Sequence, residues 1–385
     1  MRFYMPTDVY EEENCVVNHG ADLAKLGNHA LIVTGSHSAE RNGSLHDVTR
    51  ALATHGIRWT HFNEVEENPS VETVMRARDL GLSRGCDFVI GVGGGSPMDA
   101  AKAIALMMRH GEADESYLFD AHAKTDPLPI VCIPTTCGTG SEVTAVSVLT
   151  RPALKKKSAI PHRIFANLAL LDGKYLASAP GHVLANTTMD AFAHLAESYI
   201  NTKATPYSRM CVAAGVREWA RSKDVVLGKR EATAEACVTM LRAACFGGMS
   251  IAQTGTSLPH GLSYAVTVHT RMAHGKACGF FLRNYLAEAD PVDRDAVLSL
   301  AGFADVDDFE AYYRATCGRD AVPDAVLALA VQDLMTNPAK MALAPFAVDE
   351  TVLRRIAGIG EAGTKAGDGS MAGTAETVAA GQYQF

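Results

Sequence analysis

The fold is indicated most strongly by CDFVIGVGGGSPMDAAKAIALMMRH, residues 86–110. A short, largely apolar run at 87–90 predicts a buried strand, three adjacent glycines follow at 93–95, and an apolar-rich helical pattern begins near residue 100. Because glycine has no Cβ, the backbone N–H groups of such a loop are free to approach a phosphate. A strand, a glycine-rich loop and a helix in this order indicate a nucleotide-binding unit.

The start of this helix carries capping residues. We expect Ser96 to be the N-cap, Pro97 the first helical residue and Asp99 the reciprocal partner in a turn that resembles a capping box. The helix would then offer free N–H groups and its positive dipole end to a diphosphate. Because Ser96 stands where a third glycine would be, this is neither a Walker A loop nor a standard G-x-G-x-x-G motif. The alternative is a turn that only reverses the chain.

Strands and helices alternate on both sides of this unit. We expect further strands at 29–35, 58–65 and 127–136, and helices at 44–56, 71–85 and 100–110. Strands that are separated by single helices pair in parallel. The sequence therefore predicts a doubly wound, mostly parallel α/β domain that binds a dinucleotide, over residues 1–180.

The pattern becomes helical after about residue 180. Apolar residues recur at spacings of three to four in four segments, 185–200, 207–220, 230–255 and 307–317. We therefore expect an all-α C-terminal domain over residues 181–385. Its last stretch, 360–385, is rich in Gly, Ala and Thr, and we expect a poorly packed tail there.

The composition is that of a globular enzyme. The chain has 385 residues and a net charge of −8, which argues against nonspecific binding to nucleic acid or to an anionic membrane. No apolar run approaches the roughly 18 residues of a membrane span, and the N-terminus lacks the pattern of a secretory signal. Nine cysteines without a C-x-x-C pair indicate reduced thiols, so we expect a cytoplasmic protein.

A second polar loop, PTTCGTGSEVT at 134–144, follows the predicted strand at 129–133. It places several hydroxyls and two glycines at the carboxyl end of a strand, where α/β sheets bind ligands. The alternative is that these hydroxyls bond to the backbone of their own loop.

Four residues of the helical half could hold a metal. Asp190 and His194 stand four apart in a helical pattern and so project from one face, and His260 and His274 follow later in the chain. Three imidazoles and one carboxylate suit Fe(II) or Zn(II), with room for a substrate oxygen. The alternative is chance, because the chain has 14 histidines and acid–histidine pairs at this spacing are common.

Four separated motifs carry a family resemblance. GVGGGSPMDAAKA (91–103), PTTCGTGSEVT (134–144), MDAFAHLAESY (189–199) and IAQTGTSLPHGLSYAVTVHTRMAHGKA (251–277) occur in the order found in iron-containing (group III) alcohol dehydrogenases. The resemblance covers about residues 1–345. FYMPTDV, VTGSHSAERNGSL and FNEVEENPS resemble the 1,3-propanediol-dehydrogenase-like branch, and PTTCGTGSEVTAVSV is similar to 4-hydroxybutyrate dehydrogenases.

The resemblance implies site residues. The metal, Fe(II) with Zn(II) as a possibility, would be held by Asp190, His194, His260 and His274. The cofactor would be bound by residues of several loops: Asn68, Gly94, Gly95, Ser96, Asp99, Thr135, Thr136, Thr139, Thr144 and Lys157. The family fold is an α/β dinucleotide domain and a helical domain with the active site between them, and the resemblance also implies a homodimer.

The reaction that the resemblance implies is NAD(P)-linked oxidation of a small alcohol, diol or hydroxy acid, or reduction of an aldehyde whose oxygen is bound to Fe(II). Many members carry a histidine four residues after the third ligand, where this chain has Tyr264. We therefore expect Tyr264, bound water or the ribose hydroxyl to relay the proton. Alternatives are a relative of glycerol-phosphate dehydrogenase or dehydroquinate synthase, and a catalytically inactive nucleotide- or metal-binding module.

The first strand bears on the choice of cofactor. In doubly wound folds an acidic residue at the end of such a strand hydrogen-bonds to the adenosine ribose of NAD. The family resemblance implies the same rule, because members that prefer NAD have Asp at the position where this chain has Gly35. Without that carboxylate, Gly35 leaves space for a 2′-phosphate that Ser36 could contact, so we expect NADP(H) to be preferred over NAD(H). The alternative is that Gly35 only shapes a turn and both cofactors serve.

Overall fold

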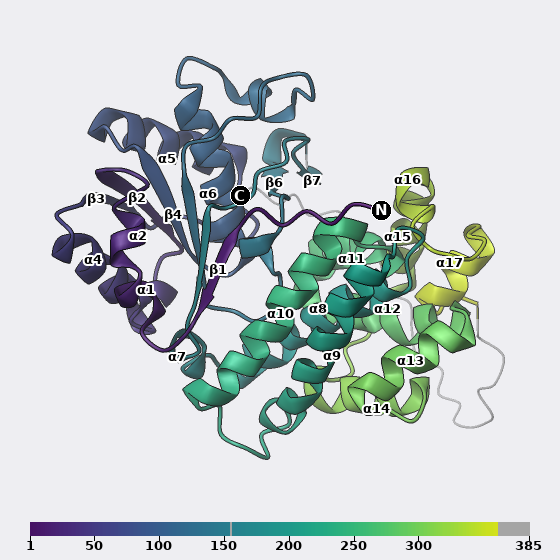
Figure 1. The fold of residues 1–385 in the computed structure, drawn as a ribbon. Helices are drawn as coiled ribbons and strands as arrows, with labels where there is room; N and C mark the ends of the chain where they lie inside the picture. The colour runs from purple at the N-terminus through teal and green to yellow at the C-terminus, as the bar shows by residue number, and fades with distance from the viewer. Residues whose placement is uncertain (155, 361–385) are drawn as a thin grey trace, which may run out of the picture.

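The computed structural model describes residues 1–154 and 156–360, which form two parts that lie side by side (Figure 1). The purple and blue part contains a sheet with its helices, and the green and yellow part is helical. The N-terminal segment crosses the helical part before it enters the sheet, and Tyr4 exchanges two hydrogen bonds with the side chain of Gln253, of 3.1 and 2.9 Å. The predicted tail, apart from Gly360, falls outside the described residues.

The main sheet has six strands in the order β1-β8-β5-β4-β2-β3, and every neighbouring pair is parallel. The strands are β1 (Asp8–Glu11), β2 (His29–Thr34), β3 (Arg58–Phe62), β4 (Phe88–Gly93), β5 (Ile130–Pro134) and β8 (Leu168–Leu171); a separate antiparallel pair is formed by β6 (Val148–Arg151) and β7 (Lys156–Ala159). The predicted α/β class is confirmed. The sequence did not predict β1 and β8, because four residues are too few for a periodicity to emerge.

Helices cover both faces of the sheet. They are α1 (Cys15–Asn18), α2 (Gly20–Leu23), α3 (Ser38–Arg41), α4 (Ser44–Thr54), α5 (Val71–Arg84), α6 (Gly95–Arg109) and α7 (Lys174–Ala177), with 3-10 turns η1 (Glu115–Phe119), η2 (Ser141–Val143) and η3 (Pro152–Leu154). Alternate residues of β2 enter different cores. Leu31 and Val33 pack with residues of α5 and α6, whereas Ala30 and Ile32 pack with residues of α4. Burial on both faces is what a doubly wound parallel sheet requires.

The C-terminal part is helical throughout its described residues. It consists of α8 (Gly181–Tyr199), α9 (Pro206–Val226), α10 (Ala234–Thr254), α11 (Leu258–Thr270), α12 (His274–Glu288), α13 (Pro291–Ala301), α14 (Val306–Cys317), α15 (Asp324–Met335), α16 (Pro338–Met341) and α17 (Glu350–Ala357). Helix α8 packs against α9, α10 and α12 and is buried along most of its length. Within the part of the chain that the structure describes, no helix is long and apolar enough to span a membrane.

The expected cap of α6 is wrong. The N-cap is Gly94, the helix begins at Gly95, and no side chain caps it. Glycine is tolerated at an N-cap, so the helix starts two residues earlier than the capping-box pattern indicated. The hydroxyl of Ser96 instead accepts a hydrogen bond of 3.1 Å from the backbone N–H of Asn68, and the Asp99 carboxylate accepts from Ser141 and Val148.

Two glycines allow the parts of the molecule to meet closely. Gly140, in the loop after β5, lies directly against Gly248 in the middle of α10. A Cβ on Gly248 would stand 2.5 Å from the carbonyl oxygen of Gly140 and 2.7 Å from a methyl group of Val143. The second polar loop is therefore seated on α10 by backbone contact that leaves no room for a side chain.

This contact gives a test of the fold. We expect Gly248→Ala to lower the free energy of unfolding by about 1–3 kcal/mol, because the added methyl group overpacks a backbone contact. Gly247→Ala is the matched control: its Cβ would meet nothing closer than 3.4 Å, and alanine favours a helix interior by up to about 1 kcal/mol. Thermal unfolding of the two variants at one scan rate compares them, and equal midpoints would contradict the contact.

Candidate active site

A cavity of about 290 Å³ lies between the sheet part and the helical part. Its walls combine residues predicted for the cofactor with residues predicted for the metal: Asn68, Gly95, Ser96, Asp99, Thr139, Thr144, Lys157, Asp190, His194, His260, Tyr264 and His274. The structure thus brings together side chains that are up to 206 positions apart, from Asn68 to His274. Gly35, Ser36, Gly94, Thr135 and Thr136 do not line this cavity.

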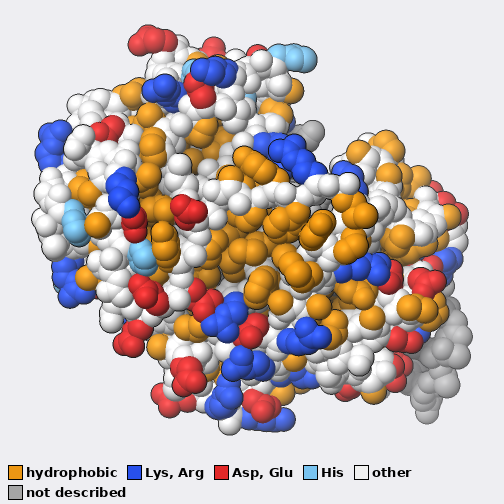
Figure 2. All heavy atoms as spheres, viewed as in Figure 1, with side chains coloured by type: hydrophobic (Ala, Val, Ile, Leu, Met, Phe, Trp, Pro, Cys, Tyr) orange, Lys and Arg blue, Asp and Glu red, His pale blue; other side chains and the backbone are white. Residues whose placement is uncertain are grey.

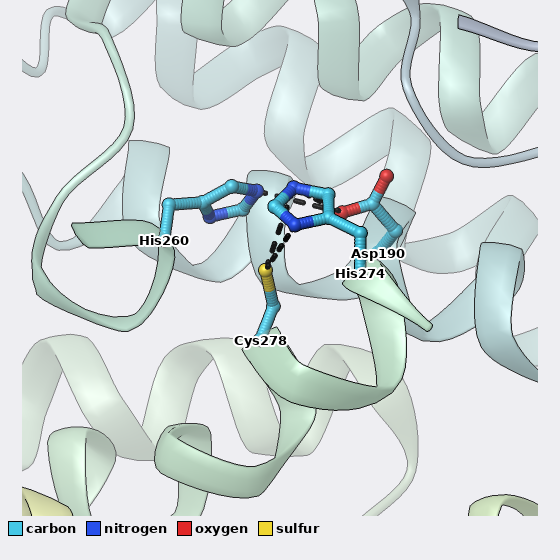
Figure 3. A group of neighbouring side chains, drawn as sticks. All are labelled: Asp190, His260, His274 and Cys278. Atoms are coloured by element: carbon cyan, nitrogen blue, oxygen red, sulfur yellow. Dashed lines mark hydrogen bonds and ion pairs between the residues drawn. The ribbon is translucent and has the colours of Figure 1, made fainter. Parts of the chain in front are cut away.

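Three helices direct potential metal ligands to one point (Figure 3). Asp190 comes from α8, His260 from α11, and His274 with Cys278 from α12; their ligand atoms all lie within 4.8 Å of one another. Asp190 Oδ1 is 3.5 Å from His260 Nε2 and 3.8 Å from His274 Nε2. This is the only group of its kind among the described residues.

Two atoms of this group lack a partner. Asp190 Oδ1 and His260 Nε2 are buried, and no hydrogen bond reaches either of them from the described residues. A buried polar atom without a partner costs free energy. A divalent cation would accept a lone pair from both atoms, so the donor set fits a metal.

The ionisation of two imidazoles, those of His194 and His274, agrees with metal binding. In the third, His260, burial lowers the pKa, but Cys278, Glu197 and Asp190 outweigh it and hold the pKa well above its usual value. Burial lowers the pKa of His194 to about 4 and that of His274 to about 3. Burial alone would raise the pKa of Asp190, but His194, His260 and His274 outweigh it and hold that pKa below its usual value. Near neutral pH the site therefore presents a carboxylate with two neutral imidazoles, which are the forms that bind metals.

Glu197 fixes the orientation of His260. Its carboxylate is fully buried and lies 2.5 Å from His260 Nδ1, and its other oxygen accepts a hydrogen bond from the backbone N–H of Ser257. A carboxylate on the far nitrogen of a ligating histidine sets the tautomer that leaves Nε2 to bind the metal. The sequence reasoning missed Glu197, although it stands three residues after His194 on the same face of α8.

His194 lies beside the group of four but is not one of its members. Its ring stacks on that of His260 with 4.4 Å between centroids, and its Nδ1 is 3.2 Å from the carbonyl oxygen of Gly138. An Nδ1–H that donates to this carbonyl leaves Nε2 as the nitrogen that could bind a metal. His194 as a ligand stays a prediction, and Cys278 is a candidate that the sequence reasoning missed.

The predicted cofactor residues meet at the carboxyl edge of the sheet. Asn68 donates its backbone N–H to Ser96 Oγ, and its side-chain oxygen accepts from Lys157 Nζ at 2.5 Å. The glycines of the first loop pack on the second loop, because a Cβ on Gly94 would meet Thr136 at 3.2 Å and one on Gly95 would meet Thr139 at 2.8 Å. Thr135 is tied to the same edge by a backbone hydrogen bond to Gly93.

A buried lysine that the sequence reasoning missed supports the second loop. Lys102 has no exposed surface, and its Nζ donates to Ser141 Oγ and to the carbonyl oxygen of Val146, both at 2.8 Å, with Thr144 Oγ1 at 3.4 Å. Asp99 Oδ1 accepts from the same Ser141 hydroxyl at 2.6 Å. Two side chains of α6 that stand one turn apart, the acidic Asp99 and the basic Lys102, therefore hold the second loop in place.

Gly35 and Ser36 lie directly after β2, and Gly94 follows β4, its neighbour in the sheet. The order of the strands reverses between β2 and β4, and open α/β sheets bind ligands at such a point. On the helical side, Tyr264 is 39% exposed, and its ring is parallel to that of His274 with 6.0 Å between centroids. The roles of these residues in cofactor choice and proton transfer stay predictions.

Comparison with known proteins places this geometry in a family. A model described as iron-containing alcohol dehydrogenase matches residues 6–173, and a second, described as the C-terminal part of the Fe-containing alcohol dehydrogenase family, matches residues 184–357. A crystal structure of an iron-containing alcohol dehydrogenase from Thermotoga maritima has 35% sequence identity and a TM-score of 0.84, and the similarity covers 92% of this chain and 98% of that one.

Two curated relatives have more specific names. The probable alcohol dehydrogenase EutG of Escherichia coli (strain K12) is 30% identical over 253 residues, 66% of this chain and 64% of EutG. The sulfoacetaldehyde reductase of Bilophila wadsworthia (strain 3_1_6) is 30% identical over 262 residues, 66% of this chain and 65% of that protein. The matched region thus spans slightly less than two thirds of the length of either relative.

The contact between the two loops yields a prediction about cofactor binding. We expect Gly95→Ala to weaken binding of a nicotinamide dinucleotide about tenfold or more, because the new methyl group pushes Thr139 and its loop out of place. Adding Thr139→Ser removes the methyl group it would meet, so the double variant should recover most of the affinity. Titration of the cofactor against each protein measures this; a double variant as weak as the single one would contradict the explanation.

Proposed function

Since the chain belongs to the iron-containing alcohol dehydrogenase family, we propose that it is a metal-dependent NAD(P)-linked alcohol dehydrogenase that works mainly as an aldehyde reductase. The observation that carries the proposal is the cavity in which Asn68, Ser96 and Lys157 of the cofactor edge face the same space as His260 and His274. A nicotinamide bound along one wall would reach a substrate held at the other. We take the substrate to be a small alcohol, diol or hydroxy acid, or the matching aldehyde.

The residues of the chain have distinct parts in this reaction. The metal would be held by Asp190, His260 and His274 together with His194, and when bound it would polarise the substrate oxygen, while the nicotinamide would carry the hydride. Glu197 keeps His260 in its ligating orientation. Tyr264 lines the cavity, where its hydroxyl would exchange a proton with the substrate oxygen.

The residues on the cofactor side of the cavity would act by orienting the dinucleotide. Lys157 and Asn68 bond to each other across the cavity wall, and Ser96 holds Asn68 through its backbone. Together they give a dinucleotide a preformed surface of donors, so that little ordering is needed on binding. Asp190 and His260 are almost fully buried, so these two side chains are shielded from solvent, whereas the His274 side chain is 29% exposed.

We also propose a cytoplasmic homodimer. All nine cysteines lie in the described part of the chain, and none forms a disulfide there, which supports a reducing compartment. Figure 2 shows hydrophobic side chains gathered over the N-terminal segment and the neighbouring helices of the C-terminal part. Phe3, Tyr207 and Met210 are exposed; the ring centroids of Phe3 and Tyr207 are 6.3 Å apart, and Met210 follows Tyr207 by one turn on α9. An exposed apolar and aromatic surface of this kind supports contact with a second copy.

The metal site can be tested by one substitution. We expect His260→Ala to lose metal retention and turnover, while cofactor affinity is kept because the dinucleotide surface is on the other wall. His269→Ala, an exposed histidine on the same helix, is the control and should behave as wild type. Metal content is measured in the purified proteins, followed by assays with NADPH and NADH on a panel of aldehydes that includes sulfoacetaldehyde. Full activity of His260→Ala, or of thoroughly chelated wild type, would refute the proposal.

Cofactor preference is tested at Gly35. A Cβ at this position would meet only the carbonyl oxygen of Val65, at 3.4 Å, so an acidic side chain can be accommodated. We expect wild type to favour NADPH over NADH by at least about tenfold in kcat/KM, about 1.4 kcal/mol, and Gly35→Asp to lose most of this preference because its carboxylate repels the 2′-phosphate. Gly35→Ala, which adds bulk without charge, should keep it. A wild type that prefers NADH would refute the idea.

A further inference from the structure

A lysine lies behind the wall that the helical part contributes to the cavity. Lys340 belongs to α16 and is half-buried, and its Nζ donates a hydrogen bond to the hydroxyl of Thr256, a residue that lines the cavity. Helix α16 contacts α11, the helix that carries His260 (Figure 1). A cationic side chain is therefore separated from the cavity by one hydroxyl group.

The segment that carries Lys340 is held in place by hydrogen bonds. The backbone N–H of Thr202 donates to the carbonyl oxygen of Leu343 at 3.0 Å, and the Thr202 hydroxyl donates to that of Ala342 at 2.8 Å. The side-chain oxygen of Asn337 accepts from the backbone N–H of Lys340 at 3.0 Å. The ammonium group is thus positioned before a ligand arrives, so that little further ordering is needed on binding.

No carboxylate neutralises this ammonium group within the described ranges. Its one hydrogen-bond partner there is Thr256, and Lys340 takes part in none of the ion pairs that the described residues form. The acidic residues of the cavity wall lie elsewhere, since Glu67 and Asp99 belong to the sheet part and Asp190 belongs to the metal-binding group. The wall near Thr256 can therefore accept a negative charge.

Thr256 can transmit the effect of this charge to a ligand. Its oxygen accepts the hydrogen bond from Lys340, and among the described residues no acceptor takes the proton of its hydroxyl. The hydroxyl can therefore donate into the cavity that Thr256 lines. A hydroxyl that already accepts from a cation is a stronger donor, because hydrogen bonds in a chain polarise one another. The two residues together favour an anionic acceptor.

Thr256 lies within reach of the metal-binding residues. It precedes His260 by four residues, so the two Cα atoms are at most about 14 Å apart, and they are closer because α11 begins between them, at Leu258. Both residues line the same cavity. A short molecule can therefore place one end at the metal-binding group and the other at the hydroxyl of Thr256.

We propose that Thr256 and Lys340 form a subsite for a carboxylate, so that the preferred substrate is a short aldehyde with a carboxylate at its far end. The hydroxyl of Thr256 donates to the carboxylate, and Lys340 is a positioning residue that acts through this hydroxyl and through its charge. The inference rests on the proposed function. The carbonyl carbon takes a hydride from the nicotinamide, the carbonyl oxygen takes a proton, and the carboxylate is unchanged, so the product is a hydroxy acid.

The test compares two aldehydes of similar shape and different charge. Succinic semialdehyde carries a carboxylate, and in isocaproaldehyde two methyl groups replace the carboxylate oxygens. The enzyme is loaded with metal and assayed with the better of the two nicotinamide cofactors. We expect wild type to prefer succinic semialdehyde at least about tenfold in kcat/KM, because a hydrogen bond to a charged group contributes more than one between neutral groups.

Variants separate the charge from the packing of the side chain. Lys340→Gln should raise KM for succinic semialdehyde at least about tenfold and change kcat little, because the ground state and the transition state lose the same interaction. Its KM for isocaproaldehyde should stay the same. Lys340→Arg should keep the preference, and Thr256→Val, which removes the hydroxyl, should lose it. Lys203→Gln, at an exposed lysine of the helical part, is the matched control and should behave as wild type.

The alternative is that this hydrogen bond only ties α16 to the start of α11. Lys340→Gln would then lower the midpoint of thermal unfolding and slow the reduction of both aldehydes to the same extent, which would overturn the inference. A wild type that reduces isocaproaldehyde as well as succinic semialdehyde, or better, would overturn it and leave the proposed function intact. If the metal-loaded wild type reduces no aldehyde of the panel with either cofactor, the proposed function and the subsite fail together.

Discussion

Burying the carboxylate of Asp190 costs free energy, and the helices around it are arranged to offset that cost. The residue is 3% exposed in the middle of α8, yet one of its oxygens receives no hydrogen bond from the described residues. Imidazoles from α11 and α12 approach that oxygen, and the Glu197 carboxylate orients the imidazole of His260. The helical part is thus built around a negative charge that a cation would neutralise.

On the cofactor side, the structure has to keep two loops in place at the edge of the sheet, the glycine loop after β4 and the polar loop after β5. Lys102 and Asp99, one turn apart on α6, share the Ser141 hydroxyl and so tie the second loop to α6. The same loop rests on α10 through the contact of Gly140 with Gly248. Because this loop touches both α6 and α10, the distance between the cofactor edge and the metal ligands is set by packing of backbone and small side chains.

The two sides meet in one cavity because the order of the strands reverses where the glycine loop lies. The carboxyl ends of β2 and β4 leave a space there, and the helical part covers its open side with α8, α11 and α12. Tyr264, which is 39% exposed, and His274 have parallel rings, and both line this cavity.

Local patterns of the sequence were sufficient for the class of fold and for the helix that carries Asp190 and His194. The strand, glycine loop and helix at 86–110 and the Asp190–His194 spacing depend only on neighbouring residues, and both have the secondary structure that was expected. The motifs at 134–144 and 251–277 became informative through the family resemblance, because no local rule connects such distant segments. The sequence pattern predicted Ser96 as the N-cap of α6, whereas the N-cap is Gly94, because glycine is also accepted at this position.

Only the tertiary structure showed that Cys278 enters the metal-binding group, that Glu197 supports His260 and that Lys102 holds the second loop. Helical periodicity tells which residues share a face, but not which faces meet. The meeting of α8, α11 and α12 depends on how their apolar stripes pack, and that packing involves the whole core. The sequence therefore determined which side chains are available to form the site, and the packing of the helices decided which of these side chains lie close to one another.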